Sequence, residues 1–142
     1  MLEHIALGLA LVCITTVIHA SFMITGLRLS HWRIARQGLP RHEISKAISV
    51  AAFTAWMFIG VFSEALLWAL FYLYGTGISE LPDLETALYF SMVTFTSVGY
   101  GDVVLTGPWR ILASIQAANG VIIFGWTTAL IFYHMQTVYV RK

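Results

Sequence analysis

Residues 96–102, which lie between two long apolar segments, read Thr-Ser-Val-Gly-Tyr-Gly-Asp. Gly99 and Gly101 occupy alternate positions on either side of Tyr100. Successive backbone carbonyls can point to one axis only if alternate residues leave the ordinary φ/ψ regions, and glycine adopts positive φ at little steric cost. Non-helical backbone at membrane depth is tolerated only where it is buried in protein or lines a water-filled path. The stretch therefore predicts a loop whose backbone oxygens face a common axis.

The composition of the chain is that of a membrane protein. Of its 142 residues, 58% are hydrophobic and 11% are charged, whereas soluble domains are about 45–50% apolar and about 25% charged. A spanning helix needs roughly 20 apolar residues, so we expect three or four spans and little else. Cys13 is the single cysteine, which excludes an intrachain disulfide. No catalytic sequence motif is present, so we do not expect an enzyme.

Three segments are long and apolar enough to be spanning helices: 2–27, 47–74 and 109–139. A fourth, residues 83–95, has apolar residues at helical spacing. It would reach only about 20 Å at 1.5 Å per residue, which is too short for a ~30 Å hydrocarbon core. We therefore predict that it is a re-entrant helix that enters and leaves on one side.

The basic residues are distributed unevenly along the chain. Five of the eight fall within the segment 28–46, namely Arg28, Arg33, Arg36, Arg41 and Lys46, and two more end the chain. Because positively charged segments stay in the cytoplasm, we expect this linker and the C-terminus to be cytoplasmic. The N-terminus and the re-entrant region would then be external, in a plasma (inner) membrane.

Residues 87–102, ALYFSMVTFTSVGYGD, resemble the pore helix and selectivity filter of the potassium-channel family. The resemblance extends over residues 47 to about 139. It implies an all-α membrane protein with three transmembrane helices, a re-entrant pore helix and a filter loop. One loop cannot surround an ion, so we expect a four-fold symmetric homotetramer.

The resemblance also divides the chain, which we expect to be a single membrane domain over residues 1–142. Residues 1–27 would be an additional N-terminal helix, 28–46 a cytoplasmic basic linker and 47–142 the pore unit. The implied function is passive, selective conduction of K⁺ across the plasma membrane, and the resemblance points to a bacterial channel. The implied partners are further copies of the chain and membrane lipids, with no nucleic acid and no cofactor apart from K⁺ ions in the filter.

The resemblance assigns roles within the loop. The filter would consist of Thr96, Ser97, Val98, Gly99, Tyr100, Gly101 and Asp102. The carbonyls of Ser97, Val98, Gly99 and Tyr100 would be the K⁺ ligands, and the Ser97 hydroxyl would complete the innermost site. The family most often has threonine there, so we expect Ser97→Thr to tighten that site because the added methyl restricts χ1.

Three residues of the re-entrant helix would support the filter: Tyr89, Phe90 and Val93. We expect the Tyr100 ring to pack against Tyr89 and Phe90. Relatives often have tryptophan at the Tyr89 position, bonded to the aspartate equivalent to Asp102, and the tyrosine hydroxyl can donate in its place. Val93 stands where one well-studied bacterial branch has glutamate, so the inactivation behaviour of that branch is not carried over to this chain.

In the last span, the resemblance makes Gly120 a hinge candidate and Gly125 a second small position. A mid-helix glycine costs about 1 kcal/mol relative to alanine, and it serves either bending or close packing. The sequence leaves these two explanations open. Val121, Phe124 and Thr128 would line the central cavity.

Glu64 is an acid within the second apolar segment, and intramembrane acids are expensive and often functional. It is either held by hydroxyl groups of the first segment or the re-entrant helix, or it has a role in gating or pH response. His19 and His134 are expected to be buried imidazoles with satisfied hydrogen bonds rather than proton sensors. The basic linker could bind anionic headgroups, and simple topological anchoring explains its charges equally well.

Two alternatives to a potassium channel remain. A weakly selective cation channel would differ in filter geometry, and Tyr100 argues against it because non-selective relatives tend to change that position. A non-channel subunit for potassium transport would typically carry four loops in one chain, usually with one glycine each. This chain has one loop that contains both Gly99 and Gly101.

Overall fold

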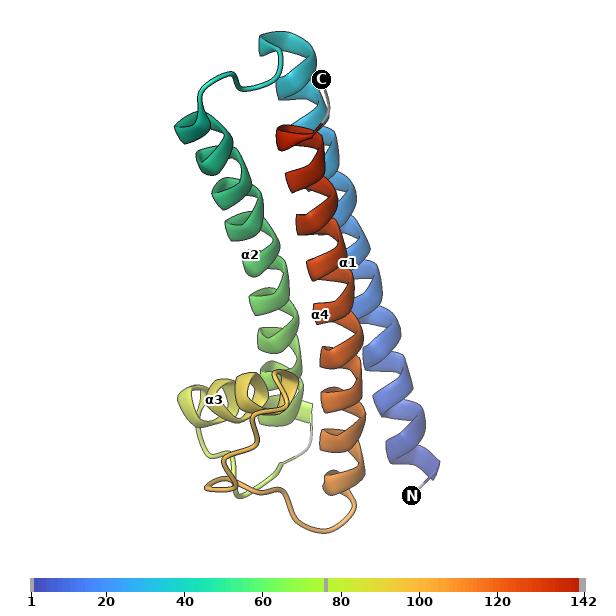
Figure 1. The fold of residues 1–142 in the computed structure, drawn as a ribbon. Coiled ribbons are helices and arrows are strands. Elements are labelled where there is room, and N and C mark those ends of the chain that lie inside the picture. The colour runs from blue at the N-terminus through green and yellow to red at the C-terminus, as the bar shows by residue number, and fades with distance from the viewer. Residues whose placement is uncertain (1, 76, 141–142) are drawn as a thin grey trace.

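The computed structural model describes residues 2–75 and 77–140, and in these ranges it contains helices and no strands. The four helices are α1 (Leu2–Gln37), α2 (Glu43–Gly75), α3 (Leu84–Phe95) and α4 (Trp109–Tyr139). Three long helices, α1, α2 and α4, form a bundle, and the short α3 lies across one end of it (Figure 1).

The three long helices are each long and apolar enough to cross a membrane. With 31 to 36 residues they extend about 45–55 Å at 1.5 Å per residue, which is more than the ~30 Å hydrocarbon core. Helix α3 has 12 residues and reaches only about 18 Å. The prediction of three spans and a short fourth helix in an all-α fold is therefore confirmed.

The first helix is longer than the sequence predicts. It continues beyond Leu27 to Gln37, so most of the basic segment is helical. It ends at Gly38, which has φ of 76° and whose N–H donates to the Ile34 carbonyl at 2.8 Å. Pro40 follows, and proline cannot continue a helix. The non-helical connection therefore comprises only residues 38–42. The basic segment before it is helical because arginine is a good helix former.

The other helix bounds lie close to those expected. Helix α2 begins at Glu43 rather than at residue 47, and α4 has the predicted bounds. Helix α3 begins one residue late because Asp83 is its N-cap, with a side-chain oxygen that accepts from the Thr86 N–H at 2.8 Å. This bond lowers the pKa of Asp83 below its ordinary range.

The N-terminal end of α1 lies at the same end of the bundle as α3 and the loop that follows it, and the 38–42 connection lies at the opposite end with the end of α4 (Figure 1). Four of the basic residues of the 28–46 segment lie on the last turns of α1 or on this connection. The C-terminal basic pair, residues 141–142, lies outside the described residues. The arrangement separates the loop from the basic end by the full length of the bundle.

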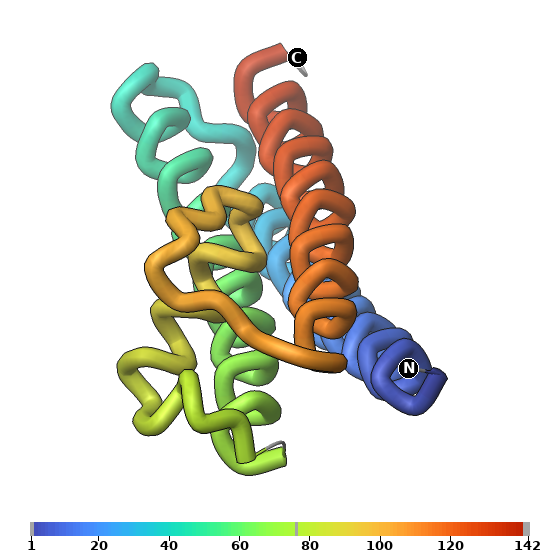
Figure 2. Tube along the Cα trace, turned by 90° about the horizontal axis from the view of Figure 1, so that it is seen from below, coloured from blue at the N-terminus to red at the C-terminus, as the bar shows by residue number. Residues whose placement is uncertain are grey.

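Helix α1 packs against both α2 and α4, and not against α3. Figure 2 shows it beside α4 and away from the loop. Small residues permit the close approach: a Cβ on Gly8 would lie 2.7 Å from Ile115 Cδ1, and one on Gly26 would lie 2.8 Å from Trp56 Cδ1. Close packing at small residues is how helices associate in membranes, so α1 is an integral part of the bundle.

Candidate functional site

The loop after α3 has an alternating backbone. Ser97, Gly99 and Gly101 have φ of 60°, 54° and 80°. The residues between them, Val98 and Tyr100, do not have positive φ. Because alternate residues have positive φ, the carbonyls of successive peptide groups point in the same direction. This is the geometry predicted from the two glycines.

The loop is tied back to the end of α3 through its N–H groups. Ser97 N–H donates to the Thr94 carbonyl at 2.9 Å, and the N–H groups of Val98 and Gly99 donate to the Val93 carbonyl at 3.0 and 3.3 Å. Among the described residues, no hydrogen bond is accepted by the backbone carbonyls of these three loop residues. The loop thus uses its donors internally and leaves its acceptors for another partner.

Ser97 is the one non-glycine residue with positive φ in the described chain. The sequence gives no sign of this, because the alternation is marked only by the two glycines. Positive φ is especially unfavourable for β-branched residues, and this supplies a physical reason for serine where the family commonly has threonine. The expected tightening by Ser97→Thr is therefore opposed by backbone strain.

The side chains of the loop are exposed in a single chain. Val98 is 54% exposed and Tyr100 is 72% exposed. No ring contact among the described residues joins Tyr100 to α3, contrary to the expected packing against Phe90. Phe90 is instead buried against Tyr72 of α2, with ring centroids 5.4 Å apart, because α3 turns this face to α2 within the same subunit.

Tyr89 and Asp102 connect α3 to the far end of the loop. The Tyr89 hydroxyl donates to Asp102 Oδ2 at 2.6 Å. This hydrogen bond lowers the pKa of Asp102 below its ordinary value, and it raises the pKa of Tyr89. The hydrogen bond holds the C-terminal end of the loop against α3.

A second clamp lies where the loop returns to α4. The Thr106 hydroxyl donates to Glu80 Oε1 at 2.5 Å, and the Ser79 hydroxyl donates to Glu80 Oε2 at 3.0 Å. These bonds lower the pKa of Glu80. They join the segment before α3 to the segment after the loop.

A buried polar network fixes α3 between α2 and α4. Gln116 Nε2 donates to Ser91 Oγ at 2.7 Å, and Ser91 Oγ donates to the Ala65 carbonyl at 2.5 Å. The Tyr72 hydroxyl donates to Gln116 Oε1 at 3.0 Å. Sequence reasoning missed these residues, although polar side chains within apolar segments were the available signal.

Gly120 is the point where α3 meets α4. A Cβ there would overlap the carbonyl oxygen of Phe95, the last residue of α3, whereas a Cβ on Gly125 would have open space around it. Close approach of two backbones therefore explains Gly120 without a bend. The structure gives Gly125 no such packing reason.

The three predicted cavity residues lie along one stretch of α4. Val121 is 61% exposed and Thr128 is also exposed, with its hydroxyl donating to the Phe124 carbonyl at 2.8 Å. Phe124 is partly buried and packs against Phe95, with ring centroids 6.0 Å apart. Val121 and Thr128 share an uncovered face of the subunit, and Phe124 borders the end of α3.

Glu64 is fully buried, and its partner is an imidazole rather than the hydroxyl group that we expected. Glu64 Oε1 lies 3.0 Å from His19 Nδ1, and both side chains are 0% exposed. The His19 ring also stacks on Trp126 of α4, with centroids 5.9 Å apart. The two residues meet because α1 packs directly on α2, which the sequence does not reveal.

His134 is buried with both ring nitrogens hydrogen-bonded, as expected, whereas the expectation is wrong for His19, whose buried Nε2 has no hydrogen-bond partner among the described residues. The Nδ1 of His134 lies 3.1 Å from Ser30 Oγ of α1, and its Nε2 lies 3.2 Å from Ser49 Oγ of α2. One histidine of α4 thus joins all three long helices at the end of the bundle opposite the loop.

Comparison with known proteins decides the class of this loop-and-helix arrangement. The family model described as "Ion channel" matches residues 50–136, which is more than half of the chain. The chain belongs to this ion channel family. The match runs from α2 through α3 and the loop to α4, and it leaves α1 outside.

The chain is also similar to a calcium-gated potassium channel, TvoK, from Thermoplasma volcanium. The two are 34% identical over 65 residues, which are 45% of this chain and 19% of the relative. The chain thus spans about a fifth of the length of that relative. No solved structure matches. Membership of this family and the three long apolar helices identify the chain as part of a membrane protein.

Proposed function

We propose that four copies of this chain form a potassium-selective pore, with the loop of residues 96–102 as its filter. The observation that carries the proposal is the alternating backbone of the loop, with its N–H groups bonded to α3 and its carbonyls unbonded within the subunit. Rings of such carbonyls replace the hydration shell of K⁺ in the Thr-Val-Gly-Tyr-Gly loops of potassium channels. The K⁺ ligands are the carbonyls of Ser97, Val98, Gly99 and Tyr100.

Exposure of the loop in one subunit supports four-fold assembly. Tyr100 and Val98 leave most of their surface uncovered, and large exposed apolar surface indicates an interaction site. In the tetramer, neighbouring subunits cover these side chains, and the Tyr100 ring packs on its neighbour instead of on its own α3. The uncovered face of α4 at Val121 and Thr128 lines the cavity below the filter.

Helix α3 adds an electrostatic contribution. Its C-terminus ends at Phe95, against Gly120 of α4. A helix carries about half a negative charge at its C-terminus, so four such ends around one axis favour a cation in the cavity. The charge at the helix ends favours the conduction of cations in general, whereas the filter carbonyls favour K⁺ over other cations.

The distribution of charges supports one orientation of the protein in the membrane. The five basic residues of the 28–46 segment lie at the end of the bundle opposite the loop, whereas Arg110, near the start of α4, lies at the loop end. Basic segments remain in the cytoplasm. The filter and the start of α1 therefore face the outside of a plasma membrane, and the end of α4 faces the cytoplasm.

The test is ion flux into liposomes that contain the intact chain, Gly99→Ala or Gly107→Ala. Gly99 and Gly107 have φ of 54° and 57°, and a Cβ on either would meet open space, so the two substitutions impose similar local strain. Only Gly99 lies in the filter. We expect K⁺ flux well above Na⁺ flux in the intact chain, loss of that preference in Gly99→Ala, and its retention in Gly107→Ala. Equal K⁺ and Na⁺ flux in the intact chain would instead support the weakly selective cation channel.

A further inference from the structure

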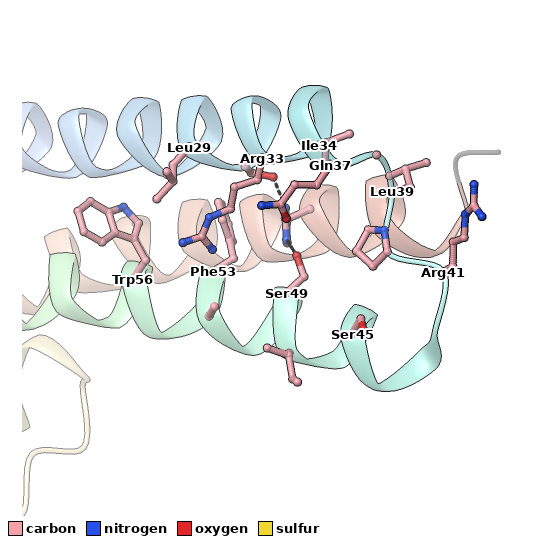
Figure 3. Close-up of a pocket in the computed structure, with 17 residues that line it drawn as sticks. Leu29, Arg33, Ile34, Gln37, Leu39, Arg41, Ser45, Ser49, Phe53 and Trp56 are labelled. Atoms are coloured by element: carbon pink, nitrogen blue, oxygen red, sulfur yellow. Dashed lines mark hydrogen bonds between the residues drawn. The ribbon is translucent and has the colours of Figure 1, made fainter.

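A groove of about 960 Å³ opens at the basic end of the bundle, far from the loop. It lies between the last turns of α1, the 38–42 connection and the first turns of α2, and His134 of α4 also lines it (Figure 3). Its volume is at the upper end of the range for small-molecule sites, about 300–1,000 Å³. None of its lining residues belongs to the filter or its supports.

The polar part of the groove is cationic. Arg33 extends from α1 into the space between α1 and α2, and Arg41 stands at the mouth, on the connection (Figure 3). Gln37, Ser45 and Ser49 add neutral hydrogen-bonding groups, and no acid lines the groove. A guanidinium group binds phosphate through two parallel hydrogen bonds.

The remaining wall is apolar and extends toward the middle of the bundle. Along α2 it runs from Ser45 past Ile48 and Phe53 to Trp56, a rise of about 16 Å. That length is close to half of a ~30 Å hydrocarbon core. Along the axis of the bundle, the groove is polar at its mouth, has Arg33 at the level of Phe53, and is apolar at its inner end near Trp56 (Figure 3). One leaflet of a bilayer changes in the same order, from headgroup to acyl chain.

His134 closes the inner side of the groove. Both of its ring nitrogens contact serine hydroxyls, at 3.1 and 3.2 Å, and its ring stacks on Phe53 with centroids 4.4 Å apart. The ring is thus held in place by its neighbours, and the charge available to a ligand comes from the arginines.

From these observations we infer that the groove binds one anionic phospholipid of the cytoplasmic leaflet. The phosphate contacts Arg33, Arg41 adds positive potential at the mouth, and one acyl chain lies along the wall toward Trp56. A free phosphate ion would leave the apolar wall in contact with water. A phospholipid would fill both the cationic and the apolar part of the groove. Anionic lipids are also attracted to basic segments by about 1 kcal/mol per charge.

A neighbouring copy of the chain fits the groove less well. Of the seven acids in the chain, only Glu43 lies at this end. Its carboxylate already accepts from Lys46 Nζ at 2.8 Å. A second copy would therefore bury the arginines without a free carboxylate to compensate them, which is costly.

The experiment uses the full chain in phosphatidylcholine vesicles that contain a small, increasing fraction of phosphatidylglycerol with brominated acyl chains. Bromine quenches tryptophan at short range, and Trp56 lines the groove. The double variant Arg33→Gln/Arg41→Gln is compared with Arg28→Gln/Arg36→Gln, which removes the same charge from the same segment but from outside the groove. We expect the first pair to raise the half-quenching fraction roughly 30-fold and the control pair to leave it nearly unchanged.

Three results would overturn the lipid site. They are equal shifts in the two double variants, equal quenching by brominated phosphatidylcholine, and displacement of the brominated lipid by soluble glycerol phosphate. Trp56→Phe should remove the arginine-dependent part of the quenching. The amount of phosphatidylglycerol retained by each purified variant is an independent readout that does not require Trp56. All these measurements report lipid binding alone, so they succeed or fail separately from K⁺ selectivity.

Discussion

Ser97 combines two requirements that conflict at a single residue. In the proposed filter its hydroxyl would complete the innermost ion site, while its backbone has φ of 60°. Threonine would keep the hydroxyl, but a β-branched side chain fits positive φ poorly. The choice of serine is explained if the backbone is the stricter requirement.

We therefore predict that Ser97→Thr is less stable than the natural chain, and less stable than Ser97→Gly by about 1–2 kcal/mol per subunit. Glycine removes the hydroxyl, but it adopts positive φ without steric cost. Thermal unfolding of the assembly in K⁺ measures the difference. A threonine variant at least as stable as the natural chain would contradict the argument from backbone strain at this residue.

The hydrogen bond from Tyr89 to Asp102 makes the loop sensitive to acid. It lowers the pKa of Asp102 from the ordinary 3.8. Because the folded pKa is below the unfolded one, its stabilising contribution is complete above pH ~3.8 and is lost as the pH falls through the lowered value.

Tyr89→Phe removes the donor, so the pKa of Asp102 should return toward its ordinary value. We predict that acid inactivation of K⁺ flux then begins at a higher pH than in the natural chain. Tyr89→Trp, which restores an N–H donor, should behave more like the natural chain. Identical acid profiles for the phenylalanine and natural proteins would show that this bond does not stabilise the loop.

At the scale of helices, apolar length and turn residues predict most of the fold. The last span and the short α3 have the expected bounds to within one residue, because proline and aspartate mark their starts. The end of α1 is not predicted, since a basic helix that extends beyond the membrane has the same composition as a basic loop. The contacts between helices are also not predicted, because side-chain pairs such as His19 and Glu64 depend on how distant segments pack.

Gly120 and Gly125 offer a matched test of helix packing. Gly120→Ala places a methyl group against the Phe95 carbonyl, whereas Gly125→Ala places it in open space. We predict that Gly120→Ala destabilises the fold by about 1–3 kcal/mol, and that Gly125→Ala is neutral or stabilising by up to about 1 kcal/mol. Chemical unfolding in detergent measures both, and equal effects would contradict the close contact of α3 with α4.

The His19–Glu64 pair joins α1 to α2 inside the bundle. Removing one member leaves the other buried without its partner, and for buried pairs this costs about 3–5 kcal/mol. We predict such a loss for Glu64→Leu, and recovery of much of it when His19→Leu is added. Measured by unfolding, the two single changes should be strongly non-additive.

Simple additivity of these two substitutions would mean that the contact contributes little. A role of the pair in gating is a separate question, which Glu64→Gln addresses. An unchanged dependence of conductance on pH in that variant would limit Glu64 to a structural role.

At the scale of the whole molecule, one subunit leaves its filter loop and one face of α4 uncovered, and the proposed pore needs neighbouring subunits to cover them. The motif and charge pattern predict where the loop lies and which end is cytoplasmic. They do not predict the network around Gln116 and Ser91 that fixes α3, or the alternation at Ser97, because both arise from three-dimensional contacts. The proposed tetramer accounts for the uncovered Tyr100 and for the face of α4 at Val121, which neighbouring copies would cover.

The central claim is that four of these loops form a potassium-selective filter, and the most direct test is the reversal potential under K⁺ on one side of a planar bilayer and Na⁺ on the other. The selective pore predicts a reversal potential displaced strongly in the direction set by K⁺, and collapse of that displacement in Gly99→Ala but not in Gly107→Ala. A reversal potential near zero for the natural chain, with measurable current, would contradict the account.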